Sequence, residues 1–227
     1  GALLGSIVGR ILKIPVVKRF QGTPIFVEKG KIRNPEKLKH FILPYSINKY
    51  RDYVVMANDG TKGDLALSAL GVPSENIFFP INGFVKENLS SAKKMNLHDR
   101  FNLDPEVKTI TMLAKLKIWK RVDRGIFLLE KILNKHQSLK VHLVIIGDGE
   151  MLSTLRKIVI NRGLEKNVTF AGALTHEDSL SIVNSCDMFW SFYDITNLGN
   201  PLLEAAYLEK PIVTTGDRDV NFLFGNR

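Results

Sequence analysis

The sequence predicts an α/β protein in which parallel sheets are covered by helices on both faces. Short apolar runs rich in Val and Ile alternate with amphipathic stretches of about ten residues or more. These runs lack the polar alternation of half-exposed strands, which favours parallel strands joined by right-handed crossovers. The length of 227 residues exceeds a usual single domain of about 100 to 200 residues, so we expect two lobes.

The front of the chain begins in a predicted helix and continues to a boundary near residue 82. Its further predicted elements are a strand, a helix and a second strand, at residues 53–57, 60–70 and 77–79. The Pro-Ile-Asn-Gly turn at residues 80–83 follows, and glycine permits the positive φ that a hinge uses. We therefore predict that residues 1–82 and 83–227 form different lobes.

The remainder of the chain carries the regular alternation of strands and helices. The predicted strands are residues 109–114, 141–147, 168–171, 188–191 and 212–215. The predicted helices are residues 122–133, 151–162, 176–184 and 201–208. Because ligands bind at the carboxyl ends of such strands, we expect the functional residues in the loops that follow them. Asp217 and Asp219, after the last strand, are interpreted as part of a loop and not as a metal site.

Four segments in order carry a family pattern. They are Leu-Val-Ile-Ile-Gly-Asp-Gly-Glu at 143–150, Val-Thr-Phe-Ala-Gly at 168–172 with His176 and Glu177, Ser-Cys-Asp-Met-Phe-Trp-Ser at 185–191, and Leu-Glu-Ala-Ala at 203–206 followed by Lys-Pro-Ile-Val at 210–213. With the turn at 80–83, their order and spacing resemble the group 1 (family 4) retaining glycosyltransferases of the GT-B fold. The resemblance covers residues 77–215.

The resemblance implies two Rossmann-like lobes. Residues 1–82 would be an incomplete acceptor-side lobe, and residues 83–227 a nucleotide-sugar-binding lobe truncated at its end. The chain has no initiator Met and ends where the family continues, so we expect a fragment of a longer enzyme.

Two cations and a carboxylate form the candidate donor site. Taken alone, Lys115 and Lys120 belong to a basic loop, and Glu204 is a residue that the dipole of a helix start favours. In the family, an Arg and a Lys five residues later bind the donor diphosphate, and Lys115 and Lys120 occupy these positions. Glu204 matches the second Glu of the family's Glu-x7-Glu motif, whose carboxylate accepts hydrogen bonds from the ribose hydroxyls.

Neighbouring residues extend this donor site. Lysine neutralises phosphate without the bidentate fork of arginine, and Lys117, Arg121 and Arg124 are close enough in sequence to take the same role. By the resemblance, the loop of Asn197, Leu198 and Gly199 presents its backbone amides to the phosphates and the sugar, as helix starts can.

Three residues are predicted to be catalytic, and two of them, Thr196 and Gln21, depart from the family. The first Glu of the motif falls on Thr196, and Asp194 is the nearest carboxylate. Gln21 stands where many relatives have a His close to the transferred sugar. Glutamine can donate a hydrogen bond but does not titrate.

Composition limits the other function classes. A single cysteine, Cys186, favours a reducing, cytoplasmic location, and no apolar run of about 18 residues could cross a bilayer. His136, His142 and His176 lack the spacing of metal ligands, so we expect neither a metal nor a cofactor. No Gly-x-Gly-x-x-Gly follows a strand, which argues against a nicotinamide enzyme.

The net charge of +9 is concentrated at the front. Residues 1–83 contain 12 Lys and Arg against 6 Asp and Glu. A basic cluster there lies beside two apolar residues and could attract an anionic membrane surface, although a solvated face is an equal alternative; it comprises Lys29, Lys31, Arg33, Lys37 and Lys39, with Phe41 and Ile42. No nucleic-acid-binding motif accompanies the charge, so no such partner is expected.

Together these observations predict a metal-independent, retaining hexosyltransferase. It would move a hexose from a nucleotide-diphosphate sugar to an acceptor sugar or lipid-linked sugar, in the cytoplasm and at the inner face of the membrane. Two alternatives stay open: a non-catalytic relative that only binds nucleotide, and a basic adaptor on a membrane surface.

Overall fold

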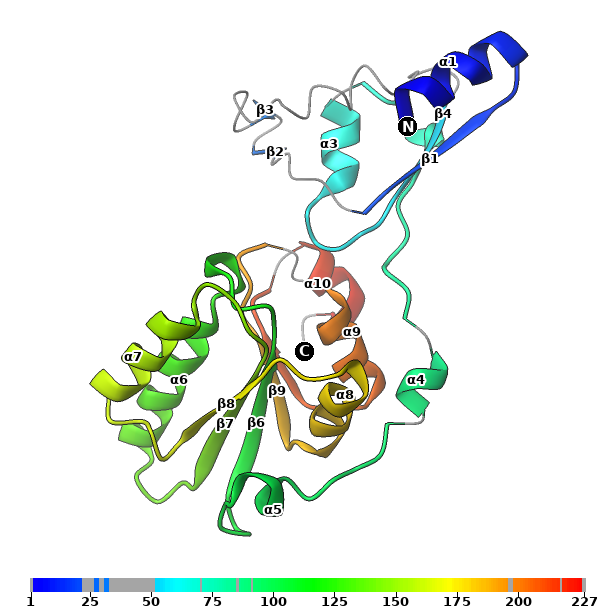
Figure 1. Ribbon diagram of the computed structural model, residues 1–227. Coiled ribbons are helices and arrows are strands. Elements are labelled where there is room, and N and C mark those ends of the chain that lie inside the picture. The colour runs from blue at the N-terminus through cyan, green and yellow to red at the C-terminus, as the bar shows by residue number, and fades with distance from the viewer. Residues whose placement is uncertain are drawn as a thin grey trace. The chain divides into compact units, whose positions relative to one another are not determined.

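Two compact units, Gly1–Asn82 and Gly83–Arg227, make up the chain (Figure 1). We refer to them as the amino-terminal unit and the carboxyl-terminal unit. The computed structural model describes residues 2–21, 27–28, 31–32, 52–69, 71–84, 86–90, 92–195, 198–216 and 218–225.

The carboxyl-terminal unit is built on a five-stranded parallel sheet with the order β10-β9-β6-β7-β8. Its strands are β6 (Lys108–Leu113), β7 (Val141–Ile146), β8 (Val168–Gly172), β9 (Met188–Ser191) and β10 (Ile212–Thr214). Each strand begins and ends within one residue of its predicted bounds. The predicted parallel sheet is therefore confirmed in this unit.

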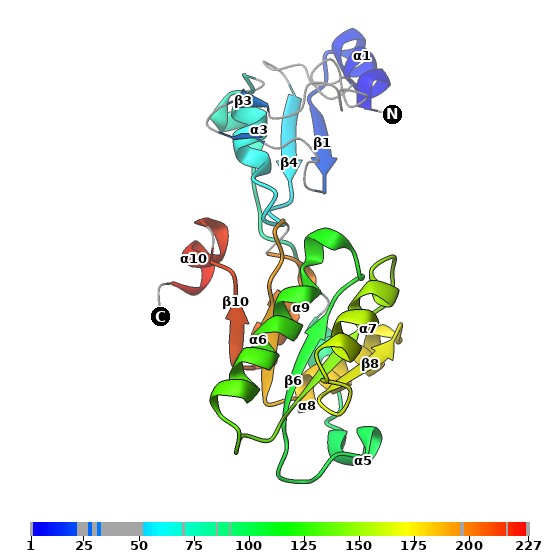
Figure 2. The same cartoon turned by 90° about the vertical axis from the view of Figure 1, so that its left-hand side faces the viewer.

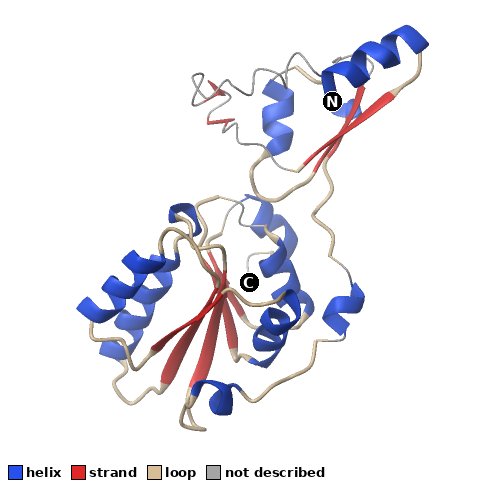
Figure 3. Cartoon of the chain, in the orientation of Figure 1, coloured by secondary structure: helices blue, strands red, loops and turns tan. Residues whose placement is uncertain are grey.

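Helices cover both faces of this sheet. They are α6 (Val122–Lys135), α7 (Leu152–Asn161), α8 (His176–Ser185) and α9 (Asn200–Tyr207). In Figures 1 and 3, α6 and α7 lie on one side of the strands, and α8 and α9 on the other. Alternate side chains of a strand point to opposite faces, so Leu143 of β7 packs with Leu129 of α6, whereas Val144 packs with Ile182 of α8. This two-sided burial explains why β7 is apolar along almost its whole length.

The order of the strands reverses between β6 and β9. From β6 the chain adds β7 and β8 on one side, and then returns to add β9 and β10 on the other. Figure 2 shows β10 and β8 at opposite edges of the sheet. The loop after β6 leads to α6 on one face, and the loop after β9 leads to α9 on the other. Such a switch point is where ligands bind in open parallel sheets.

Shorter elements complete the carboxyl-terminal unit. They are α4 (Lys86–Ser90), α5 (Leu97–Phe101), the 3-10 turn η3 (Ile118–Lys120) and α10 (Arg218–Phe224). The loop predicted around residues 217–219 is wrong for Arg218 and Asp219, because they begin α10. Val220 in the next position joins the core with Leu202, which favours helix over loop here. Asp217 lies outside the described residues.

A second parallel sheet, with the order β1-β4-β5, forms the amino-terminal unit. The elements are α1 (Ala2–Leu12), β1 (Val16–Phe20), β4 (Asp52–Met56), α3 (Gly63–Ala69), the 3-10 turn η2 (Ser74–Asn76) and β5 (Ile77–Phe78), with the antiparallel pair β2 (Val27–Glu28) and β3 (Lys31–Ile32). The helix predicted from residue 60 begins at Gly63. Side-chain oxygens of Asn58 and Asp59 accept the backbone N–H groups of Gly60 and Thr61, which stabilises a turn there.

A buried ion pair joins β1 and β4 in the amino-terminal unit. Lys18 Nζ lies 2.8 Å from Asp52 Oδ2, and the two side chains are 4% and 3% exposed. Ser6 of α1 donates to the same oxygen at 2.8 Å and also contacts Lys18. The basic cluster predicted at residues 29–42 has its side chains outside the described residues.

Candidate functional site

The candidate site lies in the loops that leave the carboxyl ends of β6 and β9. Residues 114–121 connect β6 with α6, and residues 192–199 connect β9 with α9. Because α8 follows β8 in a parallel sheet, the first residue of α8, His176, is also at this end. Most of the residues predicted for the donor site therefore gather at one end of one sheet.

Two glycines fix the loop after β6. Leu116 donates its backbone N–H to Asp148 O at 2.9 Å and accepts one from Met151 at 3.0 Å. A Cβ on Gly147 would lie 1.9 Å from Ala114 O, and a Cβ on Gly149 would lie 2.6 Å from Leu116 O. The Gly-Asp-Gly turn at 147–149 is therefore needed for close backbone packing that shapes the loop carrying Lys115 and Lys120.

Two aromatic rings hold Lys120. Its Nζ lies 3.7 Å from the centroid of the Tyr193 ring and 4.3 Å from that of the Trp119 ring. Tyr193 is itself fixed, since its hydroxyl donates to Leu113 O at 2.7 Å, and burial raises the pKa of this hydroxyl above its usual value. Cation–π contacts of this kind restrain the position of a lysine ammonium. Lys120 is thus a positioned cation, while Lys115 is exposed.

Arginines and carboxylates join the two loops in what we call the loop clasp, formed by Arg121, Asp123, Arg124 and Asp194. Arg121 Nη1 lies 3.2 Å from Asp194 Oδ2, and Arg124 Nη2 lies 2.7 Å from Asp194 Oδ1. Arg121 also binds Asp123, and the Asp123 and Asp194 carboxylates raise the pKa of its guanidinium. The Asp194 N–H donates to Trp119 O at 3.0 Å.

The loop clasp distinguishes between the neighbouring cations that the sequence suggested for binding phosphate. Arg121 adopts a left-handed backbone with φ of 47°, which costs about 1 to 2 kcal/mol in a non-glycine residue and is offset by these contacts. Arg121 and Arg124 are therefore both paired with protein carboxylates. Asp194, 40% exposed, has its carboxylate between two arginines.

Glu204 is a buried carboxylate on α9. The helix begins after Gly199 with Pro201 in its first turn, a position that suits the fixed φ of proline. The Glu204 side chain is only 7% exposed, and its Oε1 lies 3.0 Å from Nε2 of His176, which is 53% exposed. A carboxylate only accepts hydrogen bonds, so the imidazole donates.

The other predicted site residues lie in different surroundings. Leu198 is buried in the core with Leu202, so only its backbone can face a ligand, and Gly199 is the N-cap of α9. Gln21 is exposed directly after β1, in the amino-terminal unit. Thr196 and Asn197 lie outside the described residues.

Sequence reasoning missed His176 as a partner of Glu204. The two residues are 28 positions apart and come together only because α8 and α9 pack on the same face of the sheet. The sequence did show that His176 belongs to one of the segments that match the family. That match does not indicate what the side chain of His176 contacts.

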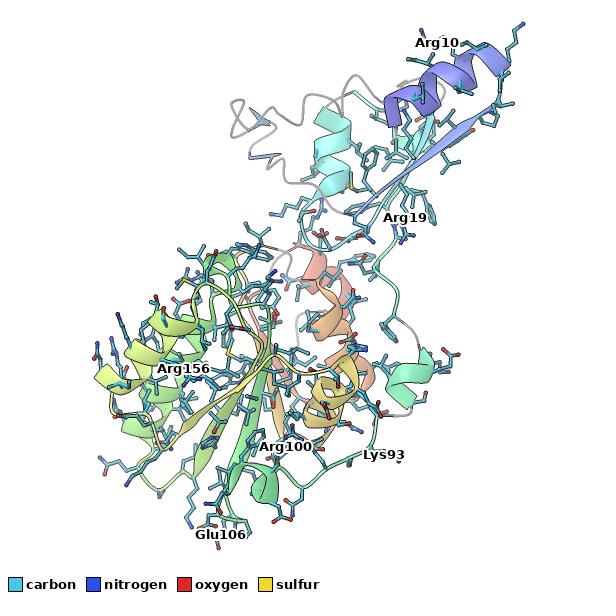
Figure 4. All side chains as sticks on the ribbon, viewed as in Figure 1. Arg10, Arg19, Lys93, Arg100, Glu106 and Arg156 are labelled. Atoms are coloured by element: carbon cyan, nitrogen blue, oxygen red, sulfur yellow. The ribbon has the colours of Figure 1, made fainter. Side chains whose placement is uncertain are left out.

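Charges at the amino end of the sheet form a separate group. Lys140, directly before β7, lies 2.6 Å from Glu106 and 3.4 Å from Asp104 in the loop before β6. Figure 4 labels Glu106 at this end of the sheet. Within the described part of the chain, no group of three or more His, Cys, Asp or Glu side chains could hold a metal ion. The helices described there include none long and apolar enough to cross a bilayer.

Comparison with known proteins shows both family and fold. The sequence profile of the family "Glycosyl transferases group 1" matches residues 93–220. The α-monoglucosyldiacylglycerol synthase of Streptococcus pneumoniae is 22% identical over 233 residues, which cover 99% of this chain and 52% of that protein.

Two solved structures share the arrangement of elements. Anabaena Alr3699/HepE in complex with UDP matches with a TM-score of 0.71 at 20% identity, over 94% of this chain and 56% of that one. The pneumococcal O-GlcNAc transferase GtfA in complex with UDP and GlcNAc matches with a TM-score of 0.65 at 14% identity, over 98% and 42%.

This chain spans about half the length of the relatives that it matches. The shared architecture confirms the predicted GT-B fold class of parallel sheets flanked by helices. Because the family profile covers more than half of its residues, the chain belongs to the group 1 glycosyltransferases.

Proposed function

We propose that the protein binds a nucleotide-diphosphate sugar at the carboxyl ends of β6 and β9 and transfers the sugar to an acceptor. The observation that carries the proposal is one arrangement: the positioned cation of Lys120, the exposed Lys115 and the buried carboxylate of Glu204 occupy the same end of one sheet. Cations and a carboxylate match the two polar parts of a nucleotide diphosphate, its phosphates and its ribose.

Each residue has a defined part in this proposal. Lys115 and Lys120 bind the diphosphate, and Glu204 accepts hydrogen bonds from the ribose hydroxyls. The backbone of Asn197, Leu198 and Gly199 approaches the phosphates and the sugar at the start of α9.

Catalysis would then depend on electrostatics. As the glycosidic bond breaks, negative charge grows on the leaving diphosphate, and fixed cations stabilise the charge that develops in the transition state. Lys120 is already restrained by two rings, so little reorganisation is needed when the charge forms. We assign catalytic positions near the transferred sugar to Asp194, Thr196 and Gln21. We further propose retention of configuration, a hexose donor and no metal.

For the acceptor we propose a lipid or lipid-linked sugar. The name of the S. pneumoniae relative, a synthase of α-monoglucosyldiacylglycerol, supports this class of acceptor. The UDP complexes of two structural relatives support UDP as the first nucleotide to test.

Calorimetric titration with UDP and GDP tests the nucleotide site. Charge-assisted hydrogen bonds contribute about 1.5 to 3 kcal/mol each, so Lys120→Ala should weaken binding about 10- to 100-fold. Lys140→Ala removes the same charge at the opposite end of the sheet and should leave affinity within about twofold. Equal affinities of the wild type and Lys120→Ala would remove this lysine from the site.

Transfer activity is tested on the protein with UDP- and GDP-hexoses and a diacylglycerol or glycolipid acceptor. Radiolabelled sugar in the lipid fraction is the expected result. Nucleotide binding without release of nucleotide or transfer of sugar, with any of these donors, would favour the non-catalytic alternative.

A further inference from the structure

The Glu204 carboxylate has one hydrogen-bond partner among the described residues, and that partner is His176. Burying a carboxylate without partners is costly, because the charge loses its hydration. The hydrogen bond from His176, at 3.0 Å, therefore helps to fix the position of this carboxylate. It occupies Oε1 and leaves Oε2 as a further acceptor.

Both ends of this hydrogen bond are anchored. His176 is the first residue of α8, and the preceding Thr175 caps that helix by accepting the N–H of Asp178 at 3.1 Å. On α9, the neighbours of Glu204 in sequence are buried in one core cluster with Val183 of α8; they are Leu203 and Ala205. The imidazole is thus held by one helix start and the carboxylate by a packed helix, so their separation is set by the fold.

A fixed carboxylate favours one arrangement of donors. A long glutamate side chain loses rotamer freedom when it binds a ligand, and a hydrogen bond already present in the free protein removes part of that cost. A ribose offers two adjacent hydroxyls to the carboxylate, whereas a 2′-deoxyribose offers one. The gain from holding Glu204 in place is therefore expected to be larger for ribonucleotides.

We propose that His176 is a positioning residue that holds the Glu204 carboxylate for the ribose, and that this pair sets the preference of the site for ribonucleotides over 2′-deoxyribonucleotides. The inference rests on the proposed function, because it requires a nucleotide at Glu204. His176 acts through Glu204 and needs no contact of its own with the reacting sugar.

The test compares the wild type with His176→Leu and His176→Gln. Leucine cannot hydrogen-bond, whereas the glutamine amide can donate to the same carboxylate oxygen. Each protein is titrated by calorimetry with UDP and 2′-deoxy-UDP, and with GDP and 2′-deoxy-GDP. Thermal unfolding of each variant is recorded beside the titrations.

We expect the wild type to bind the ribonucleotide about tenfold more tightly than its deoxy form, as one lost hydrogen bond to a charged group predicts. His176→Leu should bring the two affinities within about threefold, mostly by weakening the ribonucleotide. His176→Gln should keep the wild-type ratio. Lys120→Ala should weaken both nucleotides by the same factor, because the diphosphate is common to them.

The outcomes separate the two proposals. If the wild type binds neither UDP nor GDP, the proposed nucleotide site fails, and this inference with it. If the wild type binds and His176→Leu keeps the full preference for ribose, the nucleotide site stands and the role of His176 is overturned.

A spectroscopic measurement covers the case in which His176→Leu does not fold. In the wild type, the imidazole signals of His176 in NMR spectra should shift on addition of UDP and stay unchanged with pyrophosphate, which lacks ribose. Identical responses to both ligands would contradict the proposal.

Discussion

The buried carboxylates of Asp52, in the amino-terminal unit, and Glu204, in the carboxyl-terminal unit, are held in different ways. Asp52 in the amino-terminal unit binds Lys18 and Ser6, and the Lys18 side chain is as inaccessible as its own. Glu204 in the carboxyl-terminal unit is held by His176, half of which is exposed. The charge of Asp52 is compensated inside the protein, whereas Glu204 keeps an acceptor oxygen beside a partner that reaches solvent. The comparison favours a structural role for Asp52 and supports the binding role that we propose for Glu204.

The largest expected effect is on the Asp52 pair. Lys18→Met leaves the Asp52 carboxylate buried without its cation, and breaking a buried pair from one side typically costs about 3 to 5 kcal/mol of folding free energy. Denaturant unfolding measures the loss. The double variant Lys18→Met/Asp52→Leu should recover most of it, because no charge stays buried. A loss below about 1 kcal/mol in the single variant would contradict a structural role for this pair.

Glu204→Gln should show the reverse behaviour. The amide keeps the shape and one acceptor, so we expect the free energy of unfolding to change by about 1 kcal/mol or less. Affinity for UDP or GDP should fall about 10- to 100-fold, because the charge-assisted bonds to the ribose are lost. If Glu204→Gln instead loses as much stability as Lys18→Met and keeps its affinity for nucleotide, Glu204 has a structural role like that of Asp52.

Asp194 tests whether a carboxylate in the loop clasp also serves the reaction. Asp194→Asn keeps one acceptor oxygen for the arginines and removes the charge. We expect sugar transfer to fall at least about tenfold, or ~1.4 kcal/mol, with nucleotide affinity within about threefold. Equal losses of transfer and affinity would instead assign Asp194 to holding the loop of Lys120, and full activity would show that the loop needs no carboxylate.

The smallest expected effect is on the reactivity of Cys186, which serves as a control for the other variants. Its thiol is buried, donates to Val183 O at 3.1 Å, and has its pKa raised by burial. The reactive thiolate is therefore scarce in the folded protein near neutral pH. Glu204→Gln and Asp194→Asn should leave this thiol as slow to react with a thiol reagent as in the wild type. Fast labelling in either variant would show that its loss of affinity or of transfer results from unfolding of the carboxyl-terminal unit.

Regular elements could be predicted because their signals are local. Strand β7 is apolar along nearly its whole length, and Gly147 and Gly149 mark the turn after it, so sheet and turn follow from neighbouring residues. The lysines of the site were likewise visible in one loop after a strand.

Pairings across the sheet could not be predicted in the same way. The contacts of Asp194 with Arg121 and Arg124 depend on β6 and β9 being neighbours, although many residues separate them in the chain. The Glu204–His176 bond depends on two helices packing on one face, and no spacing rule encodes it. Local sequence therefore identified the charged residues but left open which of them are paired with other side chains of the protein.

Hydrogen–deuterium exchange with and without UDP tests the central claim most directly, because it locates the nucleotide without any substitution. Bound UDP should slow exchange in the loop at residues 114–121 and at residues 198–204, where α9 begins. It should leave residues 104–107 and 136–140, at the other end of the sheet, unchanged. Protection confined to the amino end of the sheet or to the amino-terminal unit would contradict a nucleotide site at the carboxyl ends of β6 and β9.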